Sequence, residues 1–257
     1  MRLVATLLLL GLTAFSCRAQ QQQPPELIAT PNRPTVTNTA ETTQLGVLEI
    51  ELGISAATRQ QSLPGLLKFG LLHDVELDWG GNPWQHDASV HYVGLSDNNP
   101  GLRWRFLHQA KRQPTLTVEY SAKLPTAGPI AGSGEVDHNL TLLASKDLPK
   151  HFHVDANLGY TWLGRQRGGF DHMWQPTGTL SYALSNRWQL AMEFSGATRA
   201  NAFIPAVTQN LWALSYALRP RLVLDSAVQF RVTGQVPRAV YLGGFTYSIA
   251  DLYHRKR

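Results

Sequence analysis

The sequence predicts an all-β protein: a transmembrane, up-and-down antiparallel β-barrel of about twelve strands with an N-terminal signal peptide. Three observations predict this class. Apolar and polar residues alternate over many short stretches, as they do in half-buried strands. A hairpin phrase, clearest in YALSNRWQLAMEF (residues 182–194), recurs along the chain, most closely in YALRPRLVLD (residues 216–225). Short polar turns also alternate with longer and more variable connections.

The first residues have the composition of a secretory signal peptide. A basic residue precedes the apolar run from Leu3 to Leu12, and small residues at the cleavage positions predict a site before Gln20. We therefore expect residues 1–19 to be removed on export to the outer membrane of a Gram-negative-type cell. The alternatives are a fortuitous apolar N-terminus and lipidation of Cys17, but the preceding residues 14–16 lack the leucine of a lipoprotein signal.

Composition argues against several other classes. The 257-residue chain has no run of 18 apolar residues after its N-terminus, so no transmembrane helix is expected. Without residues 1–19 the chain has no cysteine, which suits an oxidising periplasm. It then carries 21 basic and 18 acidic residues. A net charge of +3 with scattered basic residues gives no indication of nucleic-acid binding.

The segment before the first strand shows no regular spacing of apolar residues. Residues 20–43 are polar and rich in Pro and Gln, which predicts a flexible periplasmic arm. The alternative is that its second half, residues 29–43, lies inside the barrel as a plug. The barrel itself is expected over residues 44–250, and residues 251–257 are expected to form a C-terminal tail.

The alternating stretches predict strands whose connections sort by length. Strands are expected over 44–56, 64–72, 75–79, 93–108, 115–124, up to 146, over 152–163, on either side of Ser185-Asn186, and over 212–218, 222–231 and 239–249. The short turns are His73-Asp74, Gln109 to Gln113, Asp147 to Lys150, Ser185-Asn186 and Arg219-Pro220. With twelve strands they all fall at one end of the barrel. Short periplasmic turns, longer outer loops and periplasmic termini are typical of outer-membrane barrels.

Aromatic residues sort in the same way and predict two interfacial belts. Those near the short turns are Phe69, Phe106, Phe152, Tyr182, Trp188 and Tyr216. Those near the longer connections are Trp79, Trp162, Trp174 and Phe230. The main alternative fold, a secreted β-sandwich, would place its aromatic residues in the middle of its strands. The two clusters therefore favour the barrel.

Polar side chains at alternating strand positions are predicted to line the lumen. They are Glu49, Glu51, Glu76, Asp78, Arg103, Arg105, Glu119, Lys123, Asp155, Glu193, Asp225 and Arg231. The arginines of one strand lie beside an acid and a lysine of the next, and such a field screens solutes by charge and size. Alternatively the charges are only paired to close the barrel. Twelve strands allow either a narrow pore or a plugged lumen.

Catalytic and metal-binding alternatives have weaker support. His91, Ser96 and Asn98 lie close in sequence, as a lipase would require, but His91 and Ser96 have opposite parity and no nucleophile elbow is present. His151 and His153 form an HxH pair with Asp155, expected on one strand face, but a fourth ligand is missing. We expect no catalytic residue, cofactor or metal, so the protein is predicted not to be an enzyme.

Several motifs carry a resemblance to a known family. GLLHDVELDWG, GLSDNNPGLRWRFL, VEYSAKLPT, the loop GSGEVD and NLGYTW together resemble the MetA-pathway phenol-degradation family of outer-membrane transporters, over about Thr35 to the C-terminus. One departure is the tail: such barrels commonly end on an aromatic residue, whereas here Ile249 is followed by ADLYHRKR. The resemblance implies passage of small, aromatic solutes and supplies no catalytic residues.

The expected function is therefore an outer-membrane channel for small solutes, aromatic or hydrophobic ones included, through a narrow polar lumen. A non-conducting barrel that anchors a partner or stabilises the envelope is the alternative, and an outer-membrane lipid hydrolase is the weaker one. The expected partners are outer-membrane lipids, a small-molecule solute and the barrel-assembly machinery, without nucleic acid.

Overall fold

A computed structural model describes residues 26–128 and 132–253 of the chain. The predicted signal peptide, with Cys17, and the end of the predicted tail lie outside the described residues. Within those residues, no helix has the length and apolar character needed to cross a membrane. The described chain is built of strands and connections throughout.

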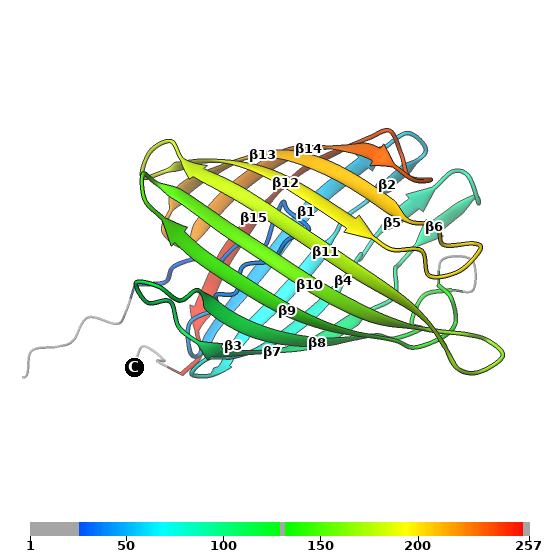
Figure 1. Ribbon diagram of the computed structural model, residues 1–257, viewed down its shortest axis with the longest axis horizontal. Helices are drawn as coiled ribbons and strands as arrows, with labels where there is room; N and C mark the ends of the chain where they lie inside the picture. The colour runs from blue at the N-terminus through cyan, green and yellow to red at the C-terminus, as the bar shows by residue number, and fades with distance from the viewer. Residues whose placement is uncertain (1–25, 129–131, 254–257) are drawn as a thin grey trace, which may run out of the picture.

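The strands form one closed antiparallel barrel, shown in Figure 1. The barrel strands are β1 (Val47–Ala57), β3 (Gly65–Leu72), β4 (Val75–Gly81), β7 (Asn99–Leu107), β8 (Thr115–Lys123), β9 (Asp137–Leu148), β10 (Phe152–Gly164), β11 (Phe170–Ala183), β12 (Trp188–Ala197), β13 (Val207–Arg219), β14 (Leu222–Thr233) and β15 (Ala239–Asp251). Each pairs with the barrel strand before it, and β15 pairs with β1 from Val47↔Asp251 to Ala57↔Val240. The predicted twelve-stranded up-and-down barrel is confirmed.

Three short strands extend the wall beyond the barrel: β2 (Gln60–Ser62), β5 (Gln85–Asp87) and β6 (Tyr92–Gly94). The prediction of one continuous strand over 93–108 is wrong, because residues 95–97 lie outside the strands and Asn98 makes only an isolated bridge to Leu124. Two hydrogen bonds join Ser96 to Asn82 there: the Asn82 amide donates to Ser96 Oγ at 2.6 Å, and the Ser96 amide donates to Asn82 O at 3.0 Å. A hydroxyl that bonds nearby backbone competes with strand pairing, and alternation alone does not reveal such a break.

The connections sort by end, as the sequence predicts. The β3–β4, β9–β10, β11–β12 and β13–β14 turns lie at one end, which we call the short-turn end, and β2, β5 and β6 lie at the opposite loop end (Figure 1). Both ends of the described chain are at the short-turn end. Ala29 donates its amide to Pro220 O at 2.9 Å, and Tyr253 donates its hydroxyl to Leu71 O at 2.8 Å.

The two faces of the wall differ in polarity. On β12, for example, Trp188, Leu190 and Phe194 are exposed on the outside, whereas Glu193 between them is fully buried on the inside. The predicted aromatic residues are on the outer face, where they pair across strands: Phe152 with Tyr182 and Trp188 with Tyr216, at centroid distances of 4.9 and 4.5 Å. An apolar outside and a polar inside is the arrangement of a membrane-spanning barrel and the reverse of a sandwich.

The last residues that the structure describes, up to Tyr253, are docked on the wall. β15 continues to Asp251, one residue beyond the predicted end of the barrel. Tyr253 then packs edge-to-face on Phe69, with ring centroids 5.7 Å apart. This contact places an aromatic residue at the short-turn end although the final strand does not end on one.

Candidate functional site

The lumen contains the N-terminal segment. Residues 26–46, which we call the arm, enter at the short-turn end, turn inside the barrel and return to the same end, where β1 begins (Figure 1). Asn32, Thr37, Ala40 and Thr43 along it are buried. The part of the predicted periplasmic arm that the structure describes therefore lies against the lumen wall.

Four buried carboxylates hold the arm by its backbone. Thr30 N donates to Glu49 at 3.1 Å, Asn32 N to Glu51 at 2.8 Å, Thr37 N to Glu193 at 2.7 Å and Thr43 N to Glu76 at 2.5 Å. Each carboxylate is at most 1% exposed. Hydrogen bonds to an ionised acceptor are roughly twice as strong as neutral ones. These carboxylates, predicted to line the lumen, thus bind the arm rather than face open solvent.

Lys68 joins two of these carboxylates. Its Nζ lies 2.6 Å from Glu49 Oε1 and 2.7 Å from Glu51 Oε1, and it donates to Thr30 O at 2.5 Å. All three side chains are almost inaccessible. Buried charges persist only when they are paired and hydrogen-bonded. Lys68 therefore makes it possible for two acids to sit side by side beneath the arm.

Arg103 has the same role on β7, two strands away from Lys68 on β3. Its Nη1 lies 2.9 Å from Glu76 Oε1, its Nε lies 3.5 Å from Glu119 Oε2, and its Nη2 donates to Thr39 O. Arg103 is 1% exposed. The predicted field of arginines facing a passing solute is not formed at this residue, because the arm covers it. Asp78 lies nearby on β4, and its Oδ1 has no hydrogen-bond partner among the described residues.

Arg105 anchors the returning part of the arm at the short-turn end. It bonds Glu41 of the arm, and its Nη2 lies 2.6 Å from Asp74 Oδ1 in the β3–β4 turn. His108 Nε2 is 2.9 Å from the other oxygen of Asp74. Burial raises the pKa of the Asp74 carboxyl, but the hydrogen bonds from Arg105 and His108 outweigh it and hold that pKa below its usual value.

This shift predicts a pH dependence. A lowered folded pKa means that Asp74 contributes its stability above its unfolded pKa and loses it as the pH falls through the folded value. The melting temperature of Asp74→Asn should therefore lie below that of the unchanged protein at neutral pH. The difference should shrink below about pH 4. Thermal unfolding in micelles at several pH values measures it, and a difference independent of pH would contradict this assignment.

Glycines on the wall make room for the arm. A Cβ at Gly53 would lie 2.2 Å from Arg33 Nη2, and one at Gly70 would lie 2.1 Å from Gln44 O. Arg33 fills the first space and reaches Asp225, with Nη2 3.3 Å from Oδ1, and also donates to Gly243 O at 3.1 Å. Only glycine permits so close an approach of another chain segment.

The remaining predicted lumen residues lie near the two ends of the barrel. Lys123 pairs with Asp137 at 2.8 Å near the loop end. Arg231 is exposed at that end and donates to Val236 O at 3.0 Å. Asp155, towards the short-turn end, lies 3.1 Å from His153 Nε2.

The predicted HxH pair does not share a strand face. His151 lies in the β9–β10 turn with φ 67°, one residue before β10 begins, although both histidines line the larger cavity described below. His153 instead lies between two aspartates, with Nδ1 2.7 Å from Asp147 Oδ1. Among the described residues no group of three or more His, Cys, Asp or Glu side chains could hold a metal ion. A prediction of metal binding at this pair is thus without geometric support.

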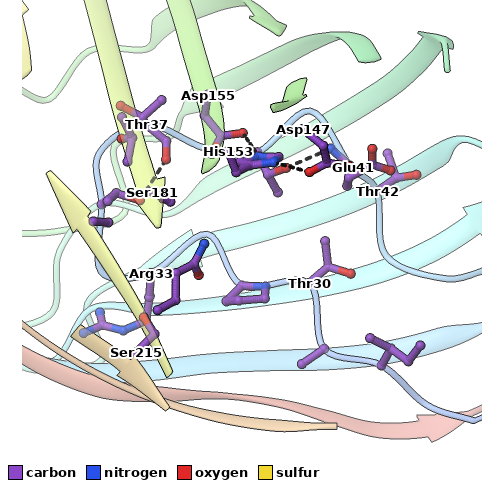
Figure 2. Close-up of a pocket in the computed structure, with 18 of the residues that line it drawn as sticks. Thr30, Arg33, Thr37, Glu41, Thr42, Asp147, His153, Asp155, Ser181 and Ser215 are labelled. Atoms are coloured by element: carbon purple, nitrogen blue, oxygen red, sulfur yellow. Dashed lines mark hydrogen bonds and ion pairs between the residues drawn. The ribbon is translucent and has the colours of Figure 1, made fainter. Parts of the chain in front are cut away.

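Two cavities remain beside the arm. The larger, about 870 Å³, opens at the short-turn end, and Figure 2 shows Thr30, Thr37 and Glu41 of the arm around it with His153. The second, about 260 Å³, lies deeper towards the loop end. Arm residues 35–39 lie between the two cavities, and their side chains alternate between them. The threonines at 35, 37 and 39 line the larger cavity, and Val36 and Asn38 line the deeper one.

The β11–β13 side of the larger cavity and the β9–β13 side of the deeper cavity carry no charged residue among those that line them. In the larger cavity, β11–β13 contribute Thr179, Ser181, Ala183, Gln189, Ala191 and Ser215. In the deeper cavity, β9–β13 contribute Asn139, Thr141, Asn157, Gly159, Gln175, Thr177, Ser195 and Gln209. These small neutral residues were absent from the predicted site, because only strand parity could have indicated them. The ionisable wall residues that line the larger cavity, Asp74, Arg105, Asp147, His153 and Asp155 among them, come from β7, β9, β10 and the β3–β4 and β9–β10 turns.

The hydrolase constellation is not assembled. Ser96 Oγ accepts from the Asn82 amide and donates to Asp97 O at 3.0 Å. Asn98 bonds Thr126 instead. His91 has a left-handed backbone conformation, φ 51°, in the connection between β5 and β6. The serine hydroxyl is thus engaged by the main chain and has no base beside it.

These features define a class: a membrane-spanning barrel of twelve strands with its own N-terminal segment folded into the lumen. The chain belongs to the family described as "Putative MetA-pathway of phenol degradation", whose model matches residues 31–249. The resemblance seen in the motifs is therefore confirmed. No curated protein matches the sequence.

Solved structures share the fold at low identity. The COG4313 outer membrane channel from Pseudomonas putida F1 is 12% identical with a TM-score of 0.61, over 88% of this chain and 98% of that one. The NanC porin is 12% identical, TM-score 0.58, over 79% and 100%. The KdgM porin is 11% identical, TM-score 0.57, over 79% and 99%. The similar structures are channels and porins, and their likeness establishes the barrel.

Proposed function

We propose that the protein is an outer-membrane channel for small solutes, aromatic or hydrophobic ones included, exported with residues 1–19 as its signal peptide. The barrel-assembly machinery and the surrounding lipids are its partners in reaching and keeping that place. The similar structures being outer-membrane channels and porins supports the location and the class of function. The description of the family supports the aromatic character of the solute.

One observation carries the proposal. Two cavities follow one another beside the arm, from the short-turn end towards the loop end, and share a neutral polar side formed by β11–β13. Side chains and the arm leave this space unfilled, whereas side chains alone fill the interior of an eight-stranded barrel. Residues 35–39 of the arm lie between the two cavities, so a displacement of this short stretch would join them.

The test is to fill the deeper cavity from the wall. Gly159 lines that cavity, and a Cβ there would meet nothing nearer than 3.3 Å, so Gly159→Leu should fold and project into the cavity. Single-channel conductance in a planar bilayer is expected to fall at least severalfold, because the narrowest part of a pore limits its current. The matched control is Gly178→Leu on the neighbouring strand, where a Cβ would meet only Asp155 O, at 3.9 Å. Its side chain would point to lipid and should leave conductance unchanged.

A non-conducting barrel is the second candidate, and the arm inside the lumen is the observation that favours it. Silence of the unchanged protein and of both glycine variants, with each barrel shown to be folded by its heat-shifted gel mobility, would overturn the channel. The function would then be to anchor a partner or to stabilise the envelope.

A further inference from the structure

A third cavity lies at the loop end and is lined by carboxamides. It has about 550 Å³ between β2 and β5 on one side and β13 and β14 on the other. Five glutamines line it: Gln60, Gln61, Gln85, Gln209 and Gln229. A carboxamide offers two donors and an acceptor without a charge. This mouth of the barrel therefore has many hydrogen-bonding groups and little net field.

The same chemistry continues inward. Gln209 lines both this cavity and the deeper cavity of about 260 Å³, so the two adjoin at its side chain. The deeper cavity adds the carboxamides of Asn38, Asn139, Asn157 and Gln175 and three hydroxyls. We call the two cavities and Gln209 between them the amide path. It ends at the arm, where Asn38 and Val36 close it.

The charged groups on the amide path are already engaged. Glu119 is held by Arg103. One oxygen of Asp87 accepts from Gln60 at 2.9 Å and the other from Ser89 N at 2.8 Å. His86 Nδ1 lies 2.8 Å from Gln61 Oε1. An ion that enters the path exchanges its hydration for groups that carry no opposite charge, which is unfavourable for the ion and acceptable to a neutral solute.

Two buried acceptors on the path are unsatisfied. Asn157 Oδ1 and Thr177 Oγ1, on neighbouring strands, make no hydrogen bond within the described part of the protein, and Asn157 is only 8% exposed. Neighbouring groups are paired: Thr161 Oγ1 donates to Asn139 Oδ1 at 2.9 Å. A buried acceptor without a partner is costly, so a solute that carries donors gains by supplying one.

We propose that the amide path is a binding site for small, uncharged solutes that carry hydroxyl groups, with Gln209 and Asn157 among the residues that recognise those groups. The deeper cavity exceeds the roughly 150 Å³ that accommodates benzene, so one six-membered ring with its hydroxyls fits. The claim that such solutes pass through the channel rests on the proposed function. The claim that they bind in the amide path does not depend on it.

The amide path is tested by measuring the equilibrium binding of three probes to the full-length protein in micelles, by saturation-transfer NMR. The probes are a neutral six-carbon cyclic polyol, the acid of matched size with one carboxylate, and cyclohexanol as a ring with one hydroxyl. The polyol is expected to bind most tightly and the acid not at all. Gln209→Leu should weaken polyol binding about three- to tenfold, the loss of one or two hydrogen bonds. Gln189→Leu, in the cavity on the other side of the arm, is the matched control and should have no effect.

The outcomes distinguish a failure of the amide path from a failure of the channel. Equal binding of acid and polyol, no binding of any probe, or insensitivity to Gln209→Leu would overturn the amide path whatever the conductance. Tightest binding of cyclohexanol would overturn recognition of several hydroxyls in favour of an apolar site. If the polyol binds, Gln209→Leu weakens that binding, and the protein gives no conductance in bilayers, the amide path is retained and the channel is overturned. Conductance without polyol binding would retain the channel and remove the path.

Discussion

Deletion of residues 26–43 is expected to raise the single-channel conductance several-fold. The arm lies between the two lumen cavities at residues 35–39 and covers four carboxylates of the wall, so its removal joins the cavities and widens the lumen. The current should also become cation-selective. Glu49, Glu51, Glu76 and Glu193 lose the amides that they accept from, whereas only Lys68 and Arg103 offset them directly.

Planar-bilayer recordings with a salt gradient measure both effects. The reversal potential should shift towards the cation value in the deleted chain and much less in the unchanged one. The matched control is a deletion of residues 26–28 only, which removes the bonds of Glu26 and Ile28 to Gln44 but keeps the four bonds of the arm amides to the wall carboxylates. Equal conductance in all three chains, with folded barrels, would show that the arm does not limit passage.

Replacing Lys68 with Met is expected to lower the free energy of unfolding by about 3–5 kcal/mol. The substitution leaves the Glu49 and Glu51 carboxylates side by side without their shared cation, fully buried. Removal of one partner from a buried ion cluster costs far more than removal of the whole cluster. Urea unfolding in micelles, followed by tryptophan fluorescence, measures the change.

The triple variant Lys68→Met, Glu49→Gln, Glu51→Gln is the control for that prediction. It should recover most of the lost stability, because glutamine side chains keep a hydrogen-bond acceptor for the Thr30 and Asn32 amides without a charge. If the triple variant is no more stable than Lys68→Met alone, the cost arises from packing of the lysine stem. The ion cluster would then not be what holds this part of the arm.

The fold could be predicted because a barrel strand has a simple period. Alternation around Glu193 and around Glu49 and Glu51 shows which face is buried, and the turn residues show where the chain reverses. The break at residues 95–97 could not be seen, since the two bonds that replace strand pairing there join Ser96 to Asn82, and alternation does not indicate them. Strand parity indicated which charged side chains point inward. Many of the groups they bond belong to the arm, whose sequence has no hydrophobic periodicity.

The arm shows why the site was only partly predictable. It is held mainly by its backbone amides, which every residue except proline has, so residues 26–46 carry little pattern that indicates a bound segment. Its polar composition is that of a disordered linker. Only the wall contains a signal in retrospect: inward acids far in excess of inward bases, and glycines at Gly53 and Gly70 where a larger residue would collide with the arm.

The alternation of residues 35–39 between two cavities has a consequence for how such a channel can diverge. Because even and odd positions meet different compartments, a point mutation at Val36 alters one compartment and a mutation at Thr37 alters the other. Deletion of a single residue upstream would exchange the two sets of side chains, as a register slip does in a strand. New selectivity can therefore arise by indels in a short unpaired segment, while the twelve strands that must be assembled in the membrane stay unchanged.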